Sequence, residues 1–369
     1  MTQQVLILGG SGRVGRSVAA DLLAYTDAAI TITGRSLDKG ERIQGDLGDR
    51  VRFLNLSLSD ADVLRSAISH AHLVIHCAGP FHYRDATVLK TCIEVGVNYL
   101  DVSDNRAFTL KALSYQPAAK EAGVTAIINT GIFPGISNSM VRQGVEQLDE
   151  VDTIHLSYVV AGSGGAGVTV MRTTFLGLQT PFQAWIEGDW RWIQPYSDRE
   201  AVAFPSPYGK AHVYWFDMPE AFTLVESFPV KTVITKFGSV PDFYNHLTWI
   251  AAHWFPKSWM KNPAGIEFLA HVSHRMTAAT NPFSGIGVAI RSEVKGRKNG
   301  QGACLNSLLV HENTAIASGY GTGSIAQLLL AGQLKKTGVW PVEQALPTDQ
   351  FEQVMASRGV QIQQEWSQV

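Results

Sequence analysis

The feature that most constrains the fold is an apolar run, a glycine-rich loop and a helical pattern in immediate succession. Val5–Leu8 has the composition of a buried strand, and Gly15–Tyr25 has the apolar spacing of a helix. Glycines between them permit a tight turn and let the backbone approach a pyrophosphate at the helix N-terminus. The alternative is a glycine turn that serves packing only. The predicted dinucleotide-binding residues of this loop are Gly9, Gly10, Ser11, Gly12, Arg13, Val14 and Gly15.

The second predicted strand, Ile30–Thr33, indicates which dinucleotide the loop would hold. An NAD site would place Asp or Glu at the end of this strand to bind both ribose hydroxyls. Here the strand is followed by Gly34, Arg35 and Ser36, and the first acid is Asp38. Arginine offers a planar cationic fork for a 2′-phosphate, and Ser36 adds a hydroxyl donor. The predicted cofactor is therefore NADP(H), with a solvated surface arginine as the alternative.

A second loop of small residues follows the predicted strand Leu73–Cys77. It consists of Cys77, Ala78, Gly79 and Pro80, which we predict to contact the cofactor. In a doubly wound sheet this loop lies at the carboxyl edge, where the nicotinamide half of a dinucleotide passes. We interpret Cys77 as a packing residue and not as a nucleophile, because the sequence shows no basic partner for its thiol.

Short apolar runs alternate with helical patterns through the first third of the chain. This alternation is typical of a parallel sheet with crossover helices. It predicts further strands at Val51–Leu54, Tyr99–Val102 and Thr125–Asn129. The predicted fold is α/β, with a Rossmann-type doubly wound parallel sheet in residues 1–130.

In the middle of the chain, predicted strands mostly follow strands. We expect a hairpin across Ala184–Ile193 that turns at Gly188 and Asp189, and a second one around Lys298–Gly300. The other expected elements are strands at Val151–Ala161, within Val202–Phe216, at Phe222–Val225, Gly287–Val294 and Gly302–His311, and a helix over Ser324–Lys335. These elements predict a second α/β domain with a mainly antiparallel sheet in residues 131–324.

Composition excludes several classes of protein. The net charge is −2, which gives no overall attraction to nucleic acid. Three cysteines in 369 residues cannot form a disulfide framework, and no Cys or His spacing suggests a metal site. The two long uncharged stretches, Thr153–Met171 and Asn313–Leu334, contain several glycines and do not predict transmembrane helices. No signal peptide is evident at the first residues, so we expect a cytoplasmic protein.

Several motifs together resemble the saccharopine dehydrogenase-like (saccharopine reductase) family. They are the first glycine loop, the Gly-Arg-Ser that ends the second strand, and Cys-Ala-Gly-Pro-Phe after the fourth. Val88–Asp104 is similar to that family's helix, strand and Tyr-x-Asp-x-Ser loop. Gly131–Asn138 is similar to its Pro-Gly loop, and Gly338–Val360 resembles its tail. The resemblance is weakest from Gly162 to Lys261.

The resemblance implies hydride transfer with NADP(H), and family members act on imines made from amino acids. It implies that residues 325–369 return to pack on the Rossmann domain. The second domain would cover the cofactor and mediate dimerisation. It also places Leu58 and Ser103 among the cofactor-binding residues. Many relatives carry an acid at the end of the third strand, where this chain has Ser57 before Leu58.

Candidate catalytic residues cluster on the fifth strand and the loop that follows it. They are Tyr99, Asp101 and Asp104. Either aspartate could stabilise an iminium, or act as a general acid if burial raises its pKa. The alternative for Asp101 is a structural role, in which its carboxylate caps the following turn. Ser137 is predicted as the N-cap of a helix that begins at Asn138.

The middle domain is rich in tryptophan and poor in arginine. Seven of the nine tryptophans lie between Trp185 and Trp259, whereas only Arg172, Arg191 and Arg199 lie between residues 151 and 261. A substrate with several carboxylates would need more cations, so the prediction is a small, rather apolar substrate. Phe243–Met260 is predicted to be a core or homodimer-interface helix. The alternatives are an apolar substrate wall or a lid that touches a membrane surface peripherally.

The function predicted from the sequence is that of an NADP(H)-dependent oxidoreductase. It would transfer hydride to or from a C=N or C=C bond of a small-molecule substrate. The alternative, from a different class, is an NADPH-binding sensor or scaffold without turnover.

Overall fold

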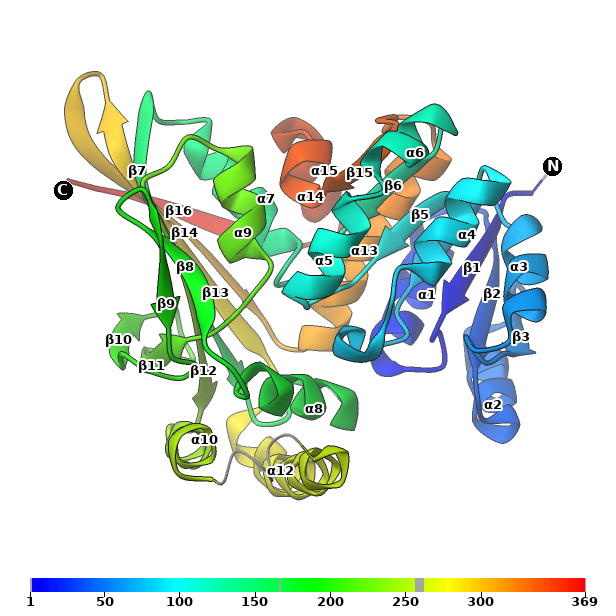
Figure 1. Ribbon diagram of the computed structural model, residues 1–369, viewed down its shortest axis with the longest axis horizontal. Helices are drawn as coiled ribbons and strands as arrows, with labels where there is room; N and C mark the ends of the chain where they lie inside the picture. Colours follow the sequence, from blue (N-terminus) through cyan, green and yellow to red (C-terminus); the bar gives the residue numbers. More distant parts are fainter. Residues whose placement is uncertain (1, 166, 256–261, 369) are drawn as a thin grey trace. The chain divides into compact units, whose positions relative to one another are not determined.

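The computed structural model describes residues 2–165, 167–255 and 262–368, which form two compact units (Figure 1). The first unit comprises Met1–Ile136 and Ala315–Arg358, and the second comprises Ser137–Thr314 and Gly359–Val369. The chain therefore leaves the first unit after Ile136, returns to it at Ala315, and ends in the second unit.

The first unit alternates strands and helices, as the sequence predicts. Its elements are β1 (Gln4–Leu8), α1 (Arg13–Tyr25), β2 (Ala29–Gly34), α2 (Leu37–Leu47), β3 (Val51–Asn55), α3 (Ala61–Ser69), β4 (Leu73–His76), a 3-10 turn (Phe81–Tyr83), α4 (Thr87–Val95), β5 (Asn98–Asp101), α5 (Arg106–Leu113), α6 (Gln116–Glu121), β6 (Thr125–Ile128), α13 (Thr314–Leu330), β15 (Gly338–Pro341), α14 (Val342–Ala345) and α15 (Thr348–Ser357).

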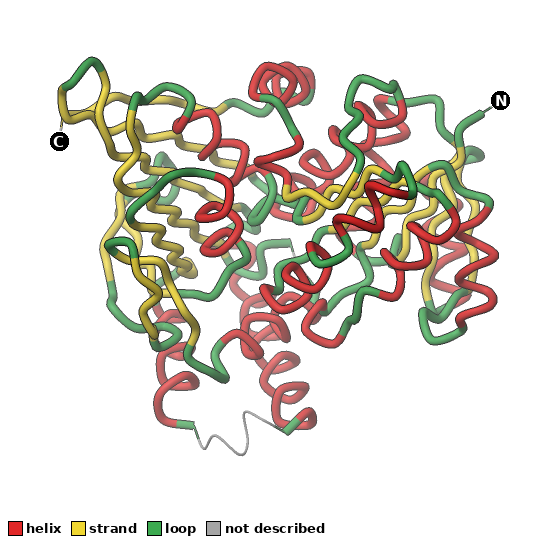
Figure 2. The backbone as a smooth tube through the Cα atoms, turned by 45° about the horizontal axis from the view of Figure 1, so that its top comes forward, coloured by secondary structure: helices red, strands yellow, loops and turns green. Residues whose placement is uncertain are grey.

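The seven strands of this unit form one parallel sheet in the order β15-β6-β5-β4-β1-β2-β3. Val5, Leu6, Ile7 and Leu8 of the central strand β1 are all buried, because helices cover both faces of a parallel sheet. Figure 2 shows these strands in yellow between layers of red helices. The doubly wound α/β prediction is confirmed.

The helix α13 approaches its neighbours closely through three glycines. A Cβ at Gly319 would lie 2.7 Å from Ser17 of α1, and one at Gly323 would lie 2.1 Å from Asp21 of the same helix. A Cβ at Gly321 would lie 2.2 Å from the carbonyl oxygen of Gly131. Atoms cannot approach that closely, so only glycine lets α13 pack here. The same glycines weaken the helical signal in the sequence, which explains why the expected helix over Ser324–Lys335 begins ten residues too late.

A buried ion pair joins the returning segment Ala315–Arg358 to the N-terminal part of the first unit. The Arg358 guanidinium donates from Nε to Asp21 Oδ1 at 2.8 Å and from Nη2 to Asp21 Oδ2 at 2.6 Å. Both side chains are 1% exposed or less, and the guanidinium also stacks on the Tyr25 ring. A bidentate pair of this geometry fixes the end of α15 against α1.

The second unit contains α7 (Ile136–Val145), β7 (Glu150–Ala161), α8 (Val168–Gly177), β8 (Phe182–Ile186), β9 (Asp189–Ile193), β10 (Glu200–Ala203), β11 (Lys210–Trp215), α9 (Glu220–Ser227), β12 (Thr232–Val240), α10 (Phe243–Trp254), α12 (Pro263–Ser284), β13 (Val288–Lys298), β14 (Gln301–His311) and β16 (Ile362–Gln368). Its large sheet has the order β10-β11-β12-β7-β13-β14-β16. Every neighbouring pair is antiparallel except β12 and β7. The prediction of a mainly antiparallel second sheet is therefore confirmed.

Alternate residues of this sheet pack against different layers, as the two-residue period of a strand requires. Ile154 and Val233 face a core that includes Val141 of α7 and Leu224 of α9. Neighbouring positions on the opposite face pack against the separate β8–β9 hairpin, whose Phe182 and Ala184 contact Trp215 and Ile234. The second unit thus has helices on one face and a hairpin on part of the other.

Four local expectations need correction. Phe222–Val225 lies within the helix α9, because Pro219 at its N-cap and Glu220 in its first turn favour a helix start. Ser137 lies inside α7 and does not cap it. The returning segment is Ala315–Arg358, not 325–369, because β16 pairs with β14 of the second sheet. Of the predicted helix Phe243–Met260, only Phe243–Trp254 is described as α10, and Trp259 and Met260 lie outside the described residues.

Within the described part of the chain, none of the helices combines the length and apolarity that crossing a bilayer requires.

Candidate functional site

The turn between β1 and α1 is held in close contacts that only glycine permits. Gly9 has a φ of +77°, and a Cβ there would lie 2.8 Å from the backbone of Ala78. A Cβ at Gly10 would lie 2.6 Å from Cβ of Ile32, and one at Gly15 would lie 2.6 Å from the Gly9 carbonyl oxygen. The loop is thus packed simultaneously against β2 and against the segment that follows β4.

Gly12 is under less steric demand than the other glycines of the loop. Its φ is −80°, which any residue can adopt, and the nearest atom to an added Cβ is the Gly9 carbonyl oxygen at 3.1 Å. Gly12 is the N-cap of α1, no side chain caps that helix, and its first turn carries no acid. The first-turn N–H groups and the helix dipole therefore suit a pyrophosphate, for which glycine leaves room. These residues fit a dinucleotide.

The end of β2 carries the predicted phosphate ligands. Arg35 and Ser36 are exposed, and among the described residues no acid forms an ion pair with Arg35. Ser36 Oγ accepts a hydrogen bond from the Lys39 N–H at 3.4 Å and so caps α2, while its hydroxyl proton stays available to donate. Thr33 connects this strand to the glycine loop, because its Oγ1 accepts from the Gly9 N–H at 3.1 Å.

A second arginine, which sequence reasoning missed, lies near Arg35. Arg84 donates from Nε to the Ala78 carbonyl oxygen at 2.8 Å, which anchors it to the segment on which Gly9 packs. Burial first, and then the positive charge of Arg35, lower the pKa of Arg84. The carboxylate of Asp85 opposes this shift. An anion bound beside both arginines would relieve their repulsion. The available signal was an arginine four residues after the Gly79-Pro80 pair.

The loop after β4 is built on a buried, neutral histidine. His76 Nδ1 accepts from the Ala78 N–H at 3.2 Å, and burial lowers the pKa of His76 to about 3. Cys77 donates its N–H to the Leu8 carbonyl oxygen at 2.8 Å, and burial raises the pKa of its thiol. A thiol that stays protonated is a weak nucleophile. Gly79 and Pro80 complete the loop, with Pro80 buried.

Asp101 is a fully buried carboxylate that organises the loop after β5. Its Oδ1 accepts from the N–H groups of Ser103 and Asn129, both at 3.0 Å, and the Tyr99 side chain interacts with the same carboxylate. Burial raises the pKa of Asp101 to about 6, although those two N–H bonds oppose the shift. The hydrogen bond from Ser103 is the turn-capping contact expected if Asp101 has a structural role.

The remaining predicted residues occupy three kinds of position. Tyr99 is 0% exposed inside the core of the parallel sheet, and Leu58 packs against the same core. Ser103 is buried, and its Oγ accepts from the Asn105 N–H at 3.3 Å. Asp104 is only partly buried, yet burial raises the pKa of its carboxyl to about 6. Of the three catalytic candidates, Asp104 is thus the one with access to solvent.

In the second unit, the start of α7 is joined to α9 by buried polar side chains. Ser137 Oγ donates to Glu220 Oε1 at 3.1 Å, and all of Ser137, Asn138 and Glu220 are 0% exposed. Ser137 therefore serves a contact between helices.

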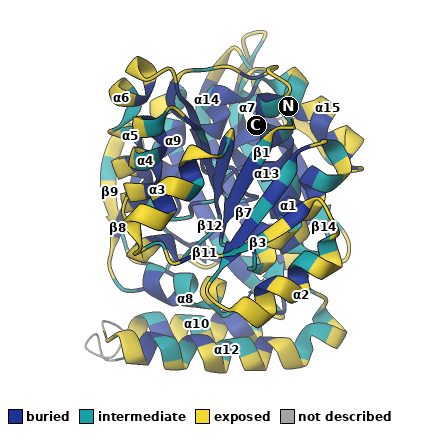
Figure 3. Cartoon of the chain, turned by 90° about the vertical axis from the view of Figure 1, so that its right-hand side faces the viewer, coloured by how far each residue is buried: buried dark blue, intermediate teal, exposed yellow. Residues whose placement is uncertain are grey.

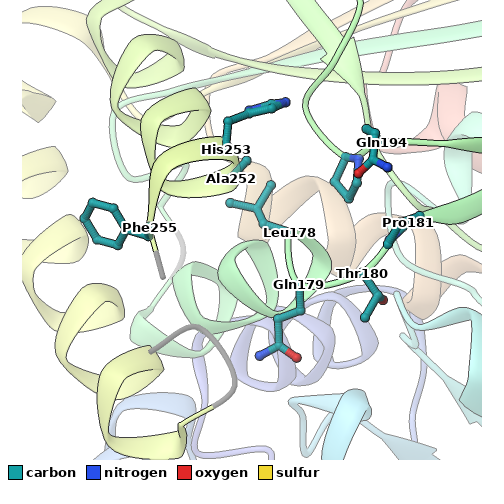
Figure 4. A pocket seen from close by; sticks show the side chains of 9 residues that line it. Leu178, Gln179, Thr180, Pro181, Gln194, Ala252, His253 and Phe255 are labelled. Atoms are coloured by element: carbon teal, nitrogen blue, oxygen red, sulfur yellow. The ribbon is translucent and has the colours of Figure 1, made fainter. Parts of the chain in front are cut away.

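A pocket in the second unit is too small to hold a metabolite. It is lined by residues that follow α8 and β9 and by the end of α10, including Leu178, Gln194 and His253 (Figure 4). Its volume of about 40 Å³ would hold only a few water molecules. The described residues also contain no cluster of His, Cys, Asp or Glu that could hold a metal ion.

The topology brings the predicted residues of the first unit to one edge. Strands β5, β4, β1 and β2 are neighbours and run parallel, so their carboxyl ends lie along one side of the sheet. The glycine loop, the loop after β4, Arg35 and Asp104 all follow these ends, where α/β sheets bind their ligands. The fold and site define a Rossmann-type dinucleotide-binding protein.

Comparisons with known proteins identify the family. Residues 5–127 match the family model of the saccharopine dehydrogenase NADP binding domain. The chain is 25% identical to the carboxynorspermidine synthase of Vibrio cholerae, over 95% of this chain and 94% of that protein. It is also 25% identical to the carboxyaminopropylagmatine dehydrogenase of Synechocystis, over 93% of each. Residues 5–127 thus match an NADP binding domain of the saccharopine dehydrogenase type, and the chain as a whole is similar to oxidoreductases of that type. These findings confirm the predicted resemblance, the NADP-dependent oxidoreductase class and the cofactor NADP(H).

The fold agrees with a solved structure. Apo saccharopine dehydrogenase (L-Glu forming) from Saccharomyces cerevisiae matches with a TM-score of 0.73 at 15% identity, over 99% of this chain and 100% of that one.

Proposed function

We propose that this protein reduces the C=N bond of an imine, formed from a carbonyl compound and an amine, to a secondary amine. NADPH supplies the hydride, and a proton completes the amine. The names of the two relatives matched over nine-tenths of their length support a C=N bond over a C=C bond. They describe carboxylated polyamines, which contain the secondary amine that such a reduction would create.

The sheet edge of the first unit provides the groups for this reaction. Arg35 and Arg84 suit the 2′-phosphate, and the loops after β1 and β4 suit the pyrophosphate and the nicotinamide half. The proposal rests mainly on Asp104. Its side chain is only partly buried at this edge, and the pKa of its carboxyl is raised to about 6. A carboxyl in that state can hold a proton for the imine nitrogen near neutral pH. Asp101 would act as a positioning residue that fixes the loop.

The three arginines between residues 151 and 261 favour a substrate with few carboxylates. Arg172 donates from Nε and Nη2 to the two oxygens of Glu267, at 2.7 and 2.6 Å. Arg191 pairs with Glu187, and Arg199 pairs with Asp242. All three arginines of this region are thus engaged by acids. We therefore infer a substrate with fewer carboxylates than saccharopine.

The proposal is tested by supplying the purified enzyme with NADPH and pairs of oxo acids and amines. We expect NADPH to be consumed only when both partners are present, because each imine forms from one carbonyl and one amine with loss of water. Reduction of an α,β-unsaturated acid without any amine would overturn the choice of a C=N bond. Efficient NADP⁺-dependent oxidation of saccharopine would overturn the substrate class.

The alternative, an NADPH sensor or scaffold, makes a different prediction in the same assay. Tight NADPH binding without consumption across the whole panel of partners would favour it. A homodimer and a cytoplasmic location also remain proposals, and light scattering of the purified protein tests the first.

A further inference from the structure

Buried polar groups connect four elements of the first unit next to the loop that carries Asp104. The elements are the end of β5, the residues after β6, and the helices α5 and α13. Figure 3 shows the strands inside this unit, including β1, in the dark blue of buried residues. Polar groups in such a place bond to one another, because water does not reach them. The pattern of these bonds therefore indicates which residues hold the loop.

Asn129 lies at the centre of these bonds. It follows β6 directly and is 0% exposed. Its side-chain Nδ2 donates to the Ser103 carbonyl oxygen and to Thr109 Oγ1, both at 2.9 Å. Its backbone N–H donates to Asp101 Oδ1 at 3.0 Å. One residue thus bonds to the end of β5, to the loop that follows β5 and to the helix α5.

Asn129 and Asp101 together fix both polar backbone groups of Ser103. Asp101 Oδ1 accepts from the Ser103 N–H at 3.0 Å, and the amide of Asn129 holds the Ser103 carbonyl oxygen. Beyond Asp104, Asn105 donates its N–H to Ser103 Oγ at 3.3 Å and caps α5 with its side chain. Asp104 therefore lies between two residues whose positions are fixed, although its own side chain is only partly buried.

Asparagine meets two separate demands at this position. The first is the backbone conformation, because Asn129 has a φ of +61°, which asparagine adopts several-fold more often than most other residues with a side chain. The second is a donor, because the Ser103 carbonyl oxygen can only accept. Glycine would suit the φ but carries no amide, and an ionised aspartate carries no donor. The side chain of Asn129 is therefore matched to holding the loop.

We propose that Asn129 is a positioning residue, which holds Asp104 at the place where it delivers a proton to the imine nitrogen. This inference rests on the proposed function, because it concerns the proton donor of that reaction. Without the amide of Asn129, the Ser103 carbonyl oxygen loses its partner, and water can reach the loop. Hydration would then lower the pKa of the Asp104 carboxyl toward its ordinary value, because burial is what raises it. The other ionisable groups on β5, on its loop and in the first turn of α5 are Tyr99, Asp101 and Arg106.

The pH profile of imine reduction tests the proposal. Asn129→Gly removes the amide and tolerates the positive φ, so backbone strain does not confound the result. We expect the limb of kcat/KM that Asp104 sets to move down by about one pH unit, so that kcat/KM at pH 7 falls about tenfold. The KM for NADPH should stay unchanged, because the glycine loop and both phosphate-binding arginines are intact.

Two variants of Thr109 separate the hydrogen bond from packing. Thr109→Val removes the oxygen that accepts from the Asn129 amide, and it should move the limb in the same direction as Asn129→Gly. Thr109→Ser keeps that oxygen and should restore the profile of the parent protein.

Thr322→Val is the matched control. Thr322 is also 0% exposed, but its hydroxyl donates to the Thr130 carbonyl oxygen at 3.1 Å and not to the loop. This variant should lower the temperature of thermal unfolding, as Thr109→Val does, and leave the pH profile unchanged.

Two results would overturn the proposal. One is that Asn129→Gly lowers the temperature of unfolding while the limb stays where it is in the parent protein. The other is that Thr322→Val moves the limb as far as Asn129→Gly, which would make the shift a general consequence of loosening. A limb that depends on Asp104 but not on Asn129 defeats this inference alone. If the parent protein shows no limb that Asp104→Asn abolishes, the proposed proton donor fails together with it.

Discussion

The two units use their charged residues in different ways. In the first unit, Asp21 and Arg358 form a pair that is withdrawn from water, whereas Arg35 and Arg84 stand close together without an ion-pair partner among the described residues. In the second unit, Lys236 is 3% exposed and pairs at 2.7 and 2.8 Å with Asp198 and Glu200, which are 67% and 41% exposed.

This difference separates structural charges from functional ones. A cation that is already paired with an acid has little attraction left for a ligand, and the ion pair stabilises the fold. Two cations that repel each other beside a glycine loop destabilise the protein slightly until an anion arrives. The placement of partners, more than the number of charges, therefore indicates which unit binds the phosphate.

The largest expected effect comes from breaking the buried pair of the first unit. Arg358→Ala would leave the Asp21 carboxylate buried without a counter-ion, and the free energy of unfolding should fall by about 3–5 kcal/mol. Chemical denaturation measures this change. The double variant Asp21→Leu, Arg358→Leu should recover most of the loss, because no charge is then stranded; a double variant as unstable as the single one would contradict this account.

The next effect tests whether the two arginines of the first unit hold a phosphate. Arg35→Ala and Arg84→Ala should each weaken NADPH binding about ten- to a hundredfold, since a charge-assisted bond contributes about 1.5–3 kcal/mol. NADH binding should change far less, because its ribose carries no phosphate. Fluorescence titration of both cofactors measures this. Equal weakening of NADPH and NADH would show that the arginine is structural.

A pH effect of intermediate size should follow from the raised pKa of Asp104. The protonated carboxyl predominates below about pH 6 and is lost above it, so kcat/KM should fall by up to about tenfold per pH unit above that value. Asp104→Asn should abolish this limb of the profile and lower the maximal rate. A limb that persists in the variant would assign the proton to another group, with Asp101 next to be tested.

The smallest effect is expected in the second unit. Lys236→Met removes the cation, but both acids can remain hydrated, and the methionine can still pack on the Trp215 ring that the lysine now contacts. We expect the free energy of unfolding to change by less than about 1 kcal/mol. Calorimetry measures the change in the free energy of unfolding for this variant and for Arg358→Ala. A loss as large as that of Arg358→Ala would remove the proposed difference between the units.

Much of the first unit could be predicted because its signals are local. Composition and residue spacing predict the strand, loop and helix around Gly9–Gly15. Arg35 comes directly after β2. Arg84 could not be found this way, because its relation to Arg35 arises only when β4 and β2 lie on either side of β1. The helix α9 was missed since four apolar or β-branched residues fit a strand as well as one helical turn.

The sequence by itself determined the parallel sheet, the glycine loop, the cofactor type and the two hairpins, because each depends on residues near one another in the chain. Tertiary structure decided the pairing of Arg358 with Asp21, the transfer of β16 to the second sheet, the burial of Asp101 and the exposure of large apolar side chains on α10 and α12. These features depend on which surfaces meet after collapse. The physical reason is that burial alters the hydration of a charge or an apolar group, and local spacing carries no information about burial by distant segments.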